Sequence, residues 1–171
     1  MKKLFVILFL ALVPLTGVAA QGKTQALPRQ QITTLVGDFS GTNGFEVVRV
    51  GRLTMGLVKT IVRKAVRESG DQDSAELLSL LNGIRSVSVV DFEDASPEAR
   101  ERFSRRLDRM LDGVDLLMET KDGGEDMRLF GVVDEAGDKL TDFIVWSPSE
   151  CKLICLYGSM SMRKLSRFLQ N

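Results

Sequence analysis

The chain has 171 residues, 23 basic and 23 acidic side chains, two cysteines and no histidine. This length suits one domain, and the balanced charge gives no general attraction to nucleic acid, which we exclude as a partner. Without histidine the chain lacks the commonest general base and the commonest metal ligand, so we expect a protein that binds and does not catalyse, and we assign no catalytic, cofactor-binding or metal-ligating residue.

Residues 1–20 have the pattern of a signal peptide. Two lysines form a short basic head, residues 4–15 are almost continuously apolar, and residues 18–20 are small. The apolar run is short for a membrane span and polar residues follow it; a retained anchor is the alternative interpretation. We expect cleavage near Ala20, export to the periplasm or the outer surface, and no transmembrane segment in the mature chain.

After the signal, the chain predicts a flexible leader over residues 21–29 and a single α+β domain over residues 30–171. Apolar residues recur at helical or alternating spacing along the first half of this domain. They predict helices over residues 32–39, 52–68 and 74–81, and strands over residues 45–50 and 84–92.

The next helix has the clearest local signals. Ser96 is suited to cap its first turn, Pro97 stands where a missing N–H costs nothing, and Gly113 is suited to end it. Ala99, Phe103, Leu107 and Met110 supply its apolar face.

The same helix carries a row of four arginines. Their spacing of i, i+3, i+4 and i+7 places them on one side, where guanidinium groups can hold the phosphates or carboxylates of anionic lipid or envelope polysaccharide. Acidic residues within helical reach favour the alternative of a solvated, salt-bridged surface. The candidate anion-binding residues are Arg102, Arg105, Arg106 and Arg109.

The back half of the domain predicts a meander of four strands. Runs rich in aliphatic and aromatic residues occupy positions 114–120, 127–133, 140–146 and 153–157. The turns between them are too short for parallel crossovers, so neighbouring strands must pair antiparallel. A last helix is predicted over residues 161–170.

We therefore expect a two-layer α+β fold, a largely antiparallel sheet with helices packed mainly on one face. Apolar and polar residues alternate imperfectly in the last two strands, which indicates that the second, partly open face also carries apolar side chains. The candidate partner surface on that face consists of Ile144, Trp146, Ile154 and Leu156.

The two cysteines predict unpaired thiols. On an extended strand, Cα atoms four residues apart are separated by about 13 Å, whereas a disulfide requires less than about 7 Å. A bridge between Cys151 and Cys155 needs Cys151 to curl back in the preceding turn. We favour free thiols, with Cys155 acting as a small buried hydrophobe.

Acidic residues gather at positions 91–98, 122–126 and 134–138, and carboxylate oxygens are the ligands that Ca²⁺ prefers. Their spacing matches no calcium-binding loop. Acidic residues are also typical of helix starts and hairpin turns, so we favour a structural role and predict no metal.

The order of these elements resembles domain of unknown function 4252, and the resemblance covers nearly the whole mature chain. The motifs that carry it are residues 116–119 followed by residues 121–124, and a final strand at 153–157 followed by Gly158 and a helix. It implies a small exported protein of Gram-negative bacteria. Many members are lipoproteins, and this chain lacks the lipid-attachment cysteine. The family has no agreed activity, so the resemblance implies no site residues.

Three functions follow as hypotheses. The first is a non-enzymatic envelope protein that binds a protein partner or an envelope component through an exposed surface, with a homo-oligomer left open. The second is an anionic lipid or polysaccharide binder that uses the arginine row. The third is a hydrolase without histidine, which requires a deep pocket with perturbed carboxylates. None of them calls for a cofactor.

Overall fold

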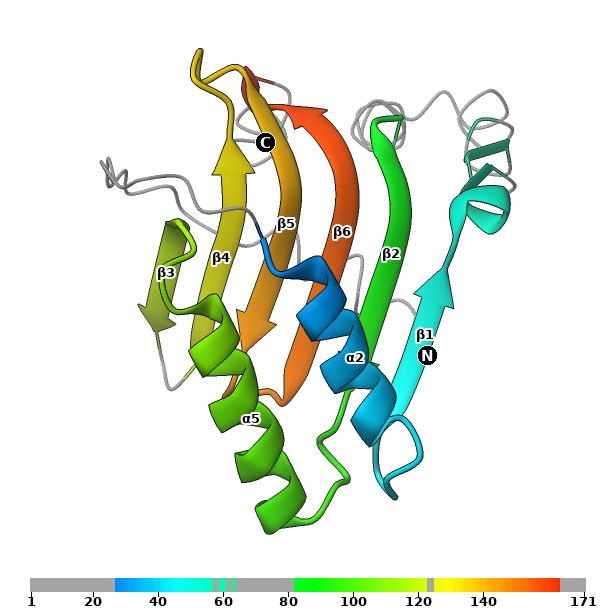
Figure 1. The fold of residues 1–171 in the computed structure, drawn as a ribbon, viewed down its shortest axis with the longest axis vertical. Helices are drawn as coiled ribbons and strands as arrows, with labels where there is room; N and C mark the ends of the chain where they lie inside the picture. Colours follow the sequence, from blue (N-terminus) through cyan, green and yellow to red (C-terminus); the bar gives the residue numbers. More distant parts are fainter. Residues whose placement is uncertain (1–26, 57–58, 61–62, 64–81, 123–124, 164–171) are drawn as a thin grey trace.

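The computed structural model describes residues 27–56, 59–60, 63, 82–122 and 125–163. In this part of the chain six strands form one sheet, and helices α2 and α5 cross the same face of it (Figure 1). The predicted signal, most of the leader, the helix at 74–81 and nearly all of the C-terminal helix lie outside the described residues.

The sheet is antiparallel throughout, with the strand order β1-β2-β6-β5-β4-β3. Its strands are β1 (Glu46–Val50), β2 (Ile84–Asp91), β3 (Leu116–Asp122), β4 (Glu125–Val133), β5 (Lys139–Ser147) and β6 (Lys152–Ser161). The last four are neighbours in space in the order in which they follow along the chain, which confirms the predicted antiparallel meander. Strands β2 and β1 extend the sheet beyond β6.

The helices α2 (Arg29–Phe39) and α5 (Pro97–Leu111) form where the apolar spacing predicts them. The Ser96 Oγ accepts a hydrogen bond from the Ala99 N–H at 3.3 Å, and Pro97 occupies the first position of α5. Gly113, with a φ of +84°, turns the chain away after the helix.

The segment after β1 is helical at its described residues 52–56, 59, 60 and 63, in agreement with the predicted helix over residues 52–68. No helix in the described part of the chain combines the length and the apolar character needed to cross a bilayer.

An aromatic cluster joins both helices to the sheet. The Phe103 ring of α5 lies 5.3 Å from Phe39 of α2, 4.8 Å from Phe92 after β2, and 6.4 Å from Trp146 of β5, measured between ring centroids. All four side chains are buried. Burial of large aromatic surface of this kind is the main stabilising contribution in a small domain.

The opposite face of the sheet carries a second apolar cluster, which includes Leu140, Phe143, Leu156 and Met160. Each of these side chains is at most 8% exposed, whereas Val87, Val145 and Ile154 on the same face are half-buried, so this face is open in part. Met55, from the helical residues after β1, belongs to the same cluster.

The predicted partner surface is wrong for Ile144 and Trp146. Both side chains are 0% exposed, in the cluster that α2 and α5 cover. Ile154 and Leu156 lie on the other face, half-buried and buried respectively. The register pairs Ile144 with Cys155 and Val145 with Ile154, and successive residues of a strand point to opposite faces, so the four predicted residues cannot share one surface.

Candidate functional site

The arginine row of α5 is engaged in part by carboxylates. The Arg106 guanidinium lies 2.9 Å from the Asp38 carboxylate of α2 and 5.8 Å from the centre of the Phe39 ring. Arg105 pairs with Glu101, one turn earlier, at 3.3 Å. These contacts make Arg106 a link between the two helices, and they reduce the charge that the row offers to an external anion.

The other two arginines of the row are exposed. The Arg109 Nε donates a hydrogen bond to the Arg105 carbonyl at 3.2 Å, one turn earlier on the same helix. Arg102 projects from the middle of α5. Sequence spacing locates the row correctly, but it cannot show that Asp38, more than sixty residues away, would meet Arg106.

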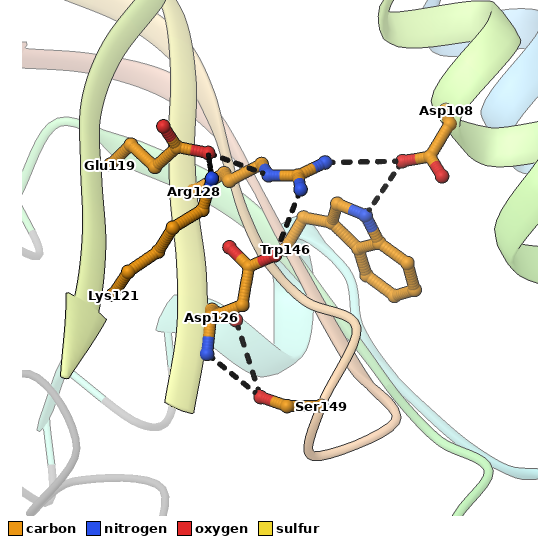
Figure 2. Close-up of polar contacts among 7 residues, drawn as sticks. All are labelled: Asp108, Glu119, Lys121, Asp126, Arg128, Trp146 and Ser149. Carbon is orange, nitrogen blue, oxygen red and sulfur yellow. Dashed lines mark hydrogen bonds and ion pairs between the residues drawn. The ribbon is translucent and has the colours of Figure 1, made fainter. Parts of the chain in front are cut away.

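A denser cluster of charges surrounds Arg128 of β4, and Figure 2 shows its contacts. The Arg128 guanidinium lies 2.8 Å from Asp126, 3.2 Å from Glu119 and 3.7 Å from Asp108. Asp108 also accepts a hydrogen bond from the Trp146 indole N–H at 3.0 Å. The cluster therefore ties α5 to β3, β4 and β5, and it gives the buried indole its hydrogen-bond partner.

Lys121 adds a second cation to this cluster. It lies 3.2 Å from Glu119. Its hydrogen bond and charge, together with those of Arg128, hold the pKa of Glu119 below its usual value. A carboxyl that serves as a general acid near neutral pH needs a raised pKa, so the pKa of Glu119 moves in the opposite direction.

The Arg128 cluster borders an open groove of about 510 Å³ between the end of α5 and strands β3 and β4. Of its charged lining residues, Asp108, Glu119 and Arg128 are paired with one another within the fold. We interpret this cluster as a structural network that fixes α5 on the sheet.

A smaller and more apolar cavity lies beneath α2. Its volume is about 220 Å³, and residues of α2, β1, β2 and β6 line it. The register sets Ser86 beside Tyr157 and Ser88 beside Cys155, on the sheet face that α2 crosses. Small serine side chains at these two positions leave space that larger side chains would fill.

The sequence analysis did not single out this cavity. The signal was present in the alternation Ser86-Val87-Ser88-Val89, where serines occupy the strand positions between valines. The register shows that the serines face the helix and that Val87 belongs to the opposite cluster.

Two titratable groups line the cavity. Burial raises the pKa of the Cys155 thiol from 9.0 to about 12. Burial also raises the pKa of Tyr157, and the neighbouring Cys155 adds to this effect, while the Thr33 side chain is hydrogen-bonded to the tyrosine. Both groups are therefore neutral at physiological pH and interact as hydrogen-bond donors or acceptors without charge.

The raised pKa of Cys155 predicts a loss of stability at high pH. The unfolded chain releases the thiol proton near pH 9, whereas the folded chain retains it until about pH 12. Between these two pH values the unfolded chain is stabilised relative to the folded chain. The ionisation of Cys155 should therefore lower the free energy of unfolding by up to about 1.4 kcal/mol per pH unit. Urea unfolding at a series of pH values measures the slope.

The matched control for this slope is Cys155→Ala, which removes the thiol and retains Tyr157. We expect the variant to lose stability less steeply above pH 9 than the wild type, whatever its stability at neutral pH. Equal slopes in the two proteins would contradict the assignment.

Cys151 and Cys155 are both free and buried. Cys151 occupies the turn before β6 with a φ of +55°, and Cys155 lies within the strand. Both thiols are therefore unpaired, in agreement with the predicted free thiols.

Two of the acidic residues at 91–98 have structural roles in the turn after β2 and at the start of α5. The Asp91 Oδ1 accepts a hydrogen bond from the Glu93 backbone N–H at 3.2 Å, and Glu98 lies in the first turn of α5. Among the residues that the structure describes, no three His, Cys, Asp or Glu side chains converge in a way that would hold a metal ion.

Comparisons with known proteins identify the family of the chain. No curated protein and no solved structure matches it. Residues 39–168, which include every strand and α5, match the family described as Domain of unknown function (DUF4252). The match covers well over half of the chain and agrees with the resemblance seen in its motifs. The chain therefore belongs to the DUF4252 family.

Proposed function

We propose that this protein is an exported, non-enzymatic binding protein of the cell envelope, and that it pairs with a partner protein along the edge of β1. The observation that carries the proposal is the state of this strand. Within the described part of the chain, β1 has a neighbour on one side only, and the exposed hydrophobic residues Val48 and Leu53 lie on and beside it.

The β1 edge is regular. Its five residues pair in continuous register with β2, from Glu46 opposite Asp91 to Val50 opposite Val87, without a bulge. Val48 in the middle of the strand is 58% exposed, and Leu53 is 91% exposed. A regular edge with apolar side chains is a template on which an extended segment of another chain adds as a further strand.

The opposite edge provides a contrast. Strand β3 has a register irregularity between Leu116 and Met118, and its Glu119 and Lys121 side chains form ion pairs. Bulges and charged side chains are the usual protection of an edge strand against pairing. The two edges of the same sheet therefore differ in register: β1 also carries the charged residues Glu46 and Arg49, but its edge has no bulge, whereas the β3 edge has one.

The two other hypotheses receive less support. Arg105 and Arg106 already pair with carboxylates, which weakens the case for an anion-binding row. The lowered pKa of Glu119 makes this carboxyl a poor general acid for a hydrolase. Export rests on the signal-like pattern of residues 1–20, and sequencing the N-terminus of the mature protein tests it, with Gln21 as the expected first residue.

Site-specific photo-crosslinking in the native cell tests the β1 proposal. A photoreactive phenylalanine at position 48 should give one discrete adduct with another protein. The same residue at position 116, an exposed leucine on the opposite edge, should not, although Leu116 is also 37% exposed. The contrast between the two positions distinguishes strand addition from general stickiness.

A second variant makes the test sharper. With the crosslinker moved to position 53, the substitution Val48→Lys should abolish the adduct, because a charged side chain at the centre of the edge disfavours pairing. Adducts of equal yield at positions 48 and 116, or an adduct at 53 that survives Val48→Lys, would refute the proposal.

A further inference from the structure

The cavity beneath α2 has a lining typical of a small-molecule site. Its apolar walls include Ile32 and Val36 of α2 and Cys155 of β6. Polar groups from Thr33, Ser88 and Tyr157 interrupt these walls. A mostly apolar concavity with a few polar groups is the usual composition of a ligand pocket.

The size of the cavity limits its occupant. An apolar cavity of about 150 Å³ accommodates benzene, and drug-sized ligands need at least about 300 Å³. The volume here, about 220 Å³, lies between these values. It suits a single ring with a small substituent, or a short aliphatic chain.

Among the residues that the structure describes, the charged lining of the cavity is positive. Arg49 of β1 lines the cavity, and its register partner in β2 is Ser88. The described lining includes no Asp or Glu, whereas the groove beside Arg128 contains several carboxylates. Arg49 is exposed, so its guanidinium stays hydrated and charged in the free protein.

We propose that this cavity binds a small monocarboxylate with an apolar body, which lies between α2 and the sheet while its carboxylate pairs with Arg49. The pairing is charge-assisted and suits the planar guanidinium. Neutral Tyr157 and Thr33 provide hydrogen-bonding groups inside the cavity without repelling the anion. The site shares β1 with the proposed partner edge through Arg49, but ligand binding is measured on the isolated protein, so its test does not depend on the partner.

Titration of the full mature protein with benzoate tests the proposal, with benzyl alcohol as the neutral probe of the same shape. Two-dimensional amide NMR reports both binding and location. We expect benzoate to shift the signals of Thr33, Ser88 and Tyr157 in a saturable manner, and to bind about tenfold more tightly than benzyl alcohol, the difference that one charge-assisted hydrogen bond provides.

Three variants complete the test. Arg49→Gln should reduce the affinity for benzoate to that for benzyl alcohol, and the matched control Arg163→Gln, which changes an exposed arginine just after β6, should leave both unchanged. Ser88→Val, a substitution that strands tolerate, should fill the cavity and abolish binding of both probes, and Ser86→Val serves if the first variant fails to fold.

Several outcomes would overturn the proposal. They are no saturable shift at millimolar benzoate, equal affinity for the two probes, an Arg49→Gln variant that binds benzoate as the wild type does, and a folded Ser88→Val or Ser86→Val variant that still binds.

Discussion

Replacing Phe103 by alanine is expected to lower the free energy of unfolding by about 3–5 kcal/mol, the range for truncating a fully buried phenylalanine. The Phe103 side chain is 0% exposed, and its ring contacts Phe39, Phe45, Phe92 and Trp146. These neighbours come from α2, β5 and the segments beside β1 and β2, so a cavity at this point loosens both helices from the sheet. Urea unfolding followed by the fluorescence of Trp146, the single tryptophan, measures the loss.

Leu116→Ala is the matched control for this prediction. Leu116 is also apolar but 37% exposed on the edge strand β3, so its truncation should change the free energy of unfolding by less than about 1 kcal/mol. A loss below about 1.5 kcal/mol for Phe103→Ala, or similar losses in both variants, would show that the aromatic cluster does not fix the helices on the sheet.

Local sequence signals predicted the elements and much of the topology. Ser96 and Pro97 set the start of α5, and short polar turns forced the last four strands into an antiparallel meander. These signals act between residues that are close along the chain, so they can be interpreted without knowledge of the rest of the fold. The strands β1 and β2 were also predicted, but their order beside β6 depends on distant pairing and was not.

The assignment of faces was less predictable, and the reason is physical. Both faces of β5 and β6 carry apolar side chains. Those on one face belong to the cluster under α2 and α5, and those on the other face belong to the second apolar cluster. Alternation identifies which residues share a face, but it cannot indicate which face α2 and α5 will cover. Ile144 and Trp146 were therefore grouped with Ile154, although the register places them on opposite sides.

The candidate sites also combine features that local sequence patterns predict with contacts between residues far apart in the chain. The spacing of the α5 arginines was visible in the sequence, while the Asp38 carboxylate that engages Arg106 comes from another helix. The cavity beneath α2 needs three strands and a helix to exist, so a local pattern can give at most an indication of it. Only the two serines of β2 gave a local indication, because small polar residues between valines suggest that the space opposite them is not filled by the strand itself.

Gly158 in β6 is a position where a single added methyl group should be strongly destabilising. Its φ of +147° lies outside the range that side-chain-bearing residues adopt readily, and a Cβ there would collide with the Gly83 carbonyl oxygen and the Ile84 backbone. The register between β2 and β6 is irregular at this point, with Ile84 opposite Gly158, so the two backbones come unusually close.

The same glycine also anchors a polar contact. Its N–H donates a hydrogen bond to the Asp142 carboxylate at 2.8 Å, and Asp142 in turn pairs with Arg29 at the start of α2. Displacing the Gly158 backbone therefore disturbs the pairing of β2 with β6, the irregular position of Asp142 in β5, and the attachment of α2.

We expect Gly158→Ala to lower the free energy of unfolding by about 3 kcal/mol or more, because backbone strain and overpacking each contribute about 1–3 kcal/mol and no flexible side chain can move aside. Gly41→Ala is the control: it has no atom within 4 Å of the added methyl group and no positive φ, so its stability should change by less than about 1 kcal/mol. Thermal and urea unfolding measure both variants. A Gly158→Ala protein as stable as Gly41→Ala would mean that β2 and β6 do not approach as closely as their register requires.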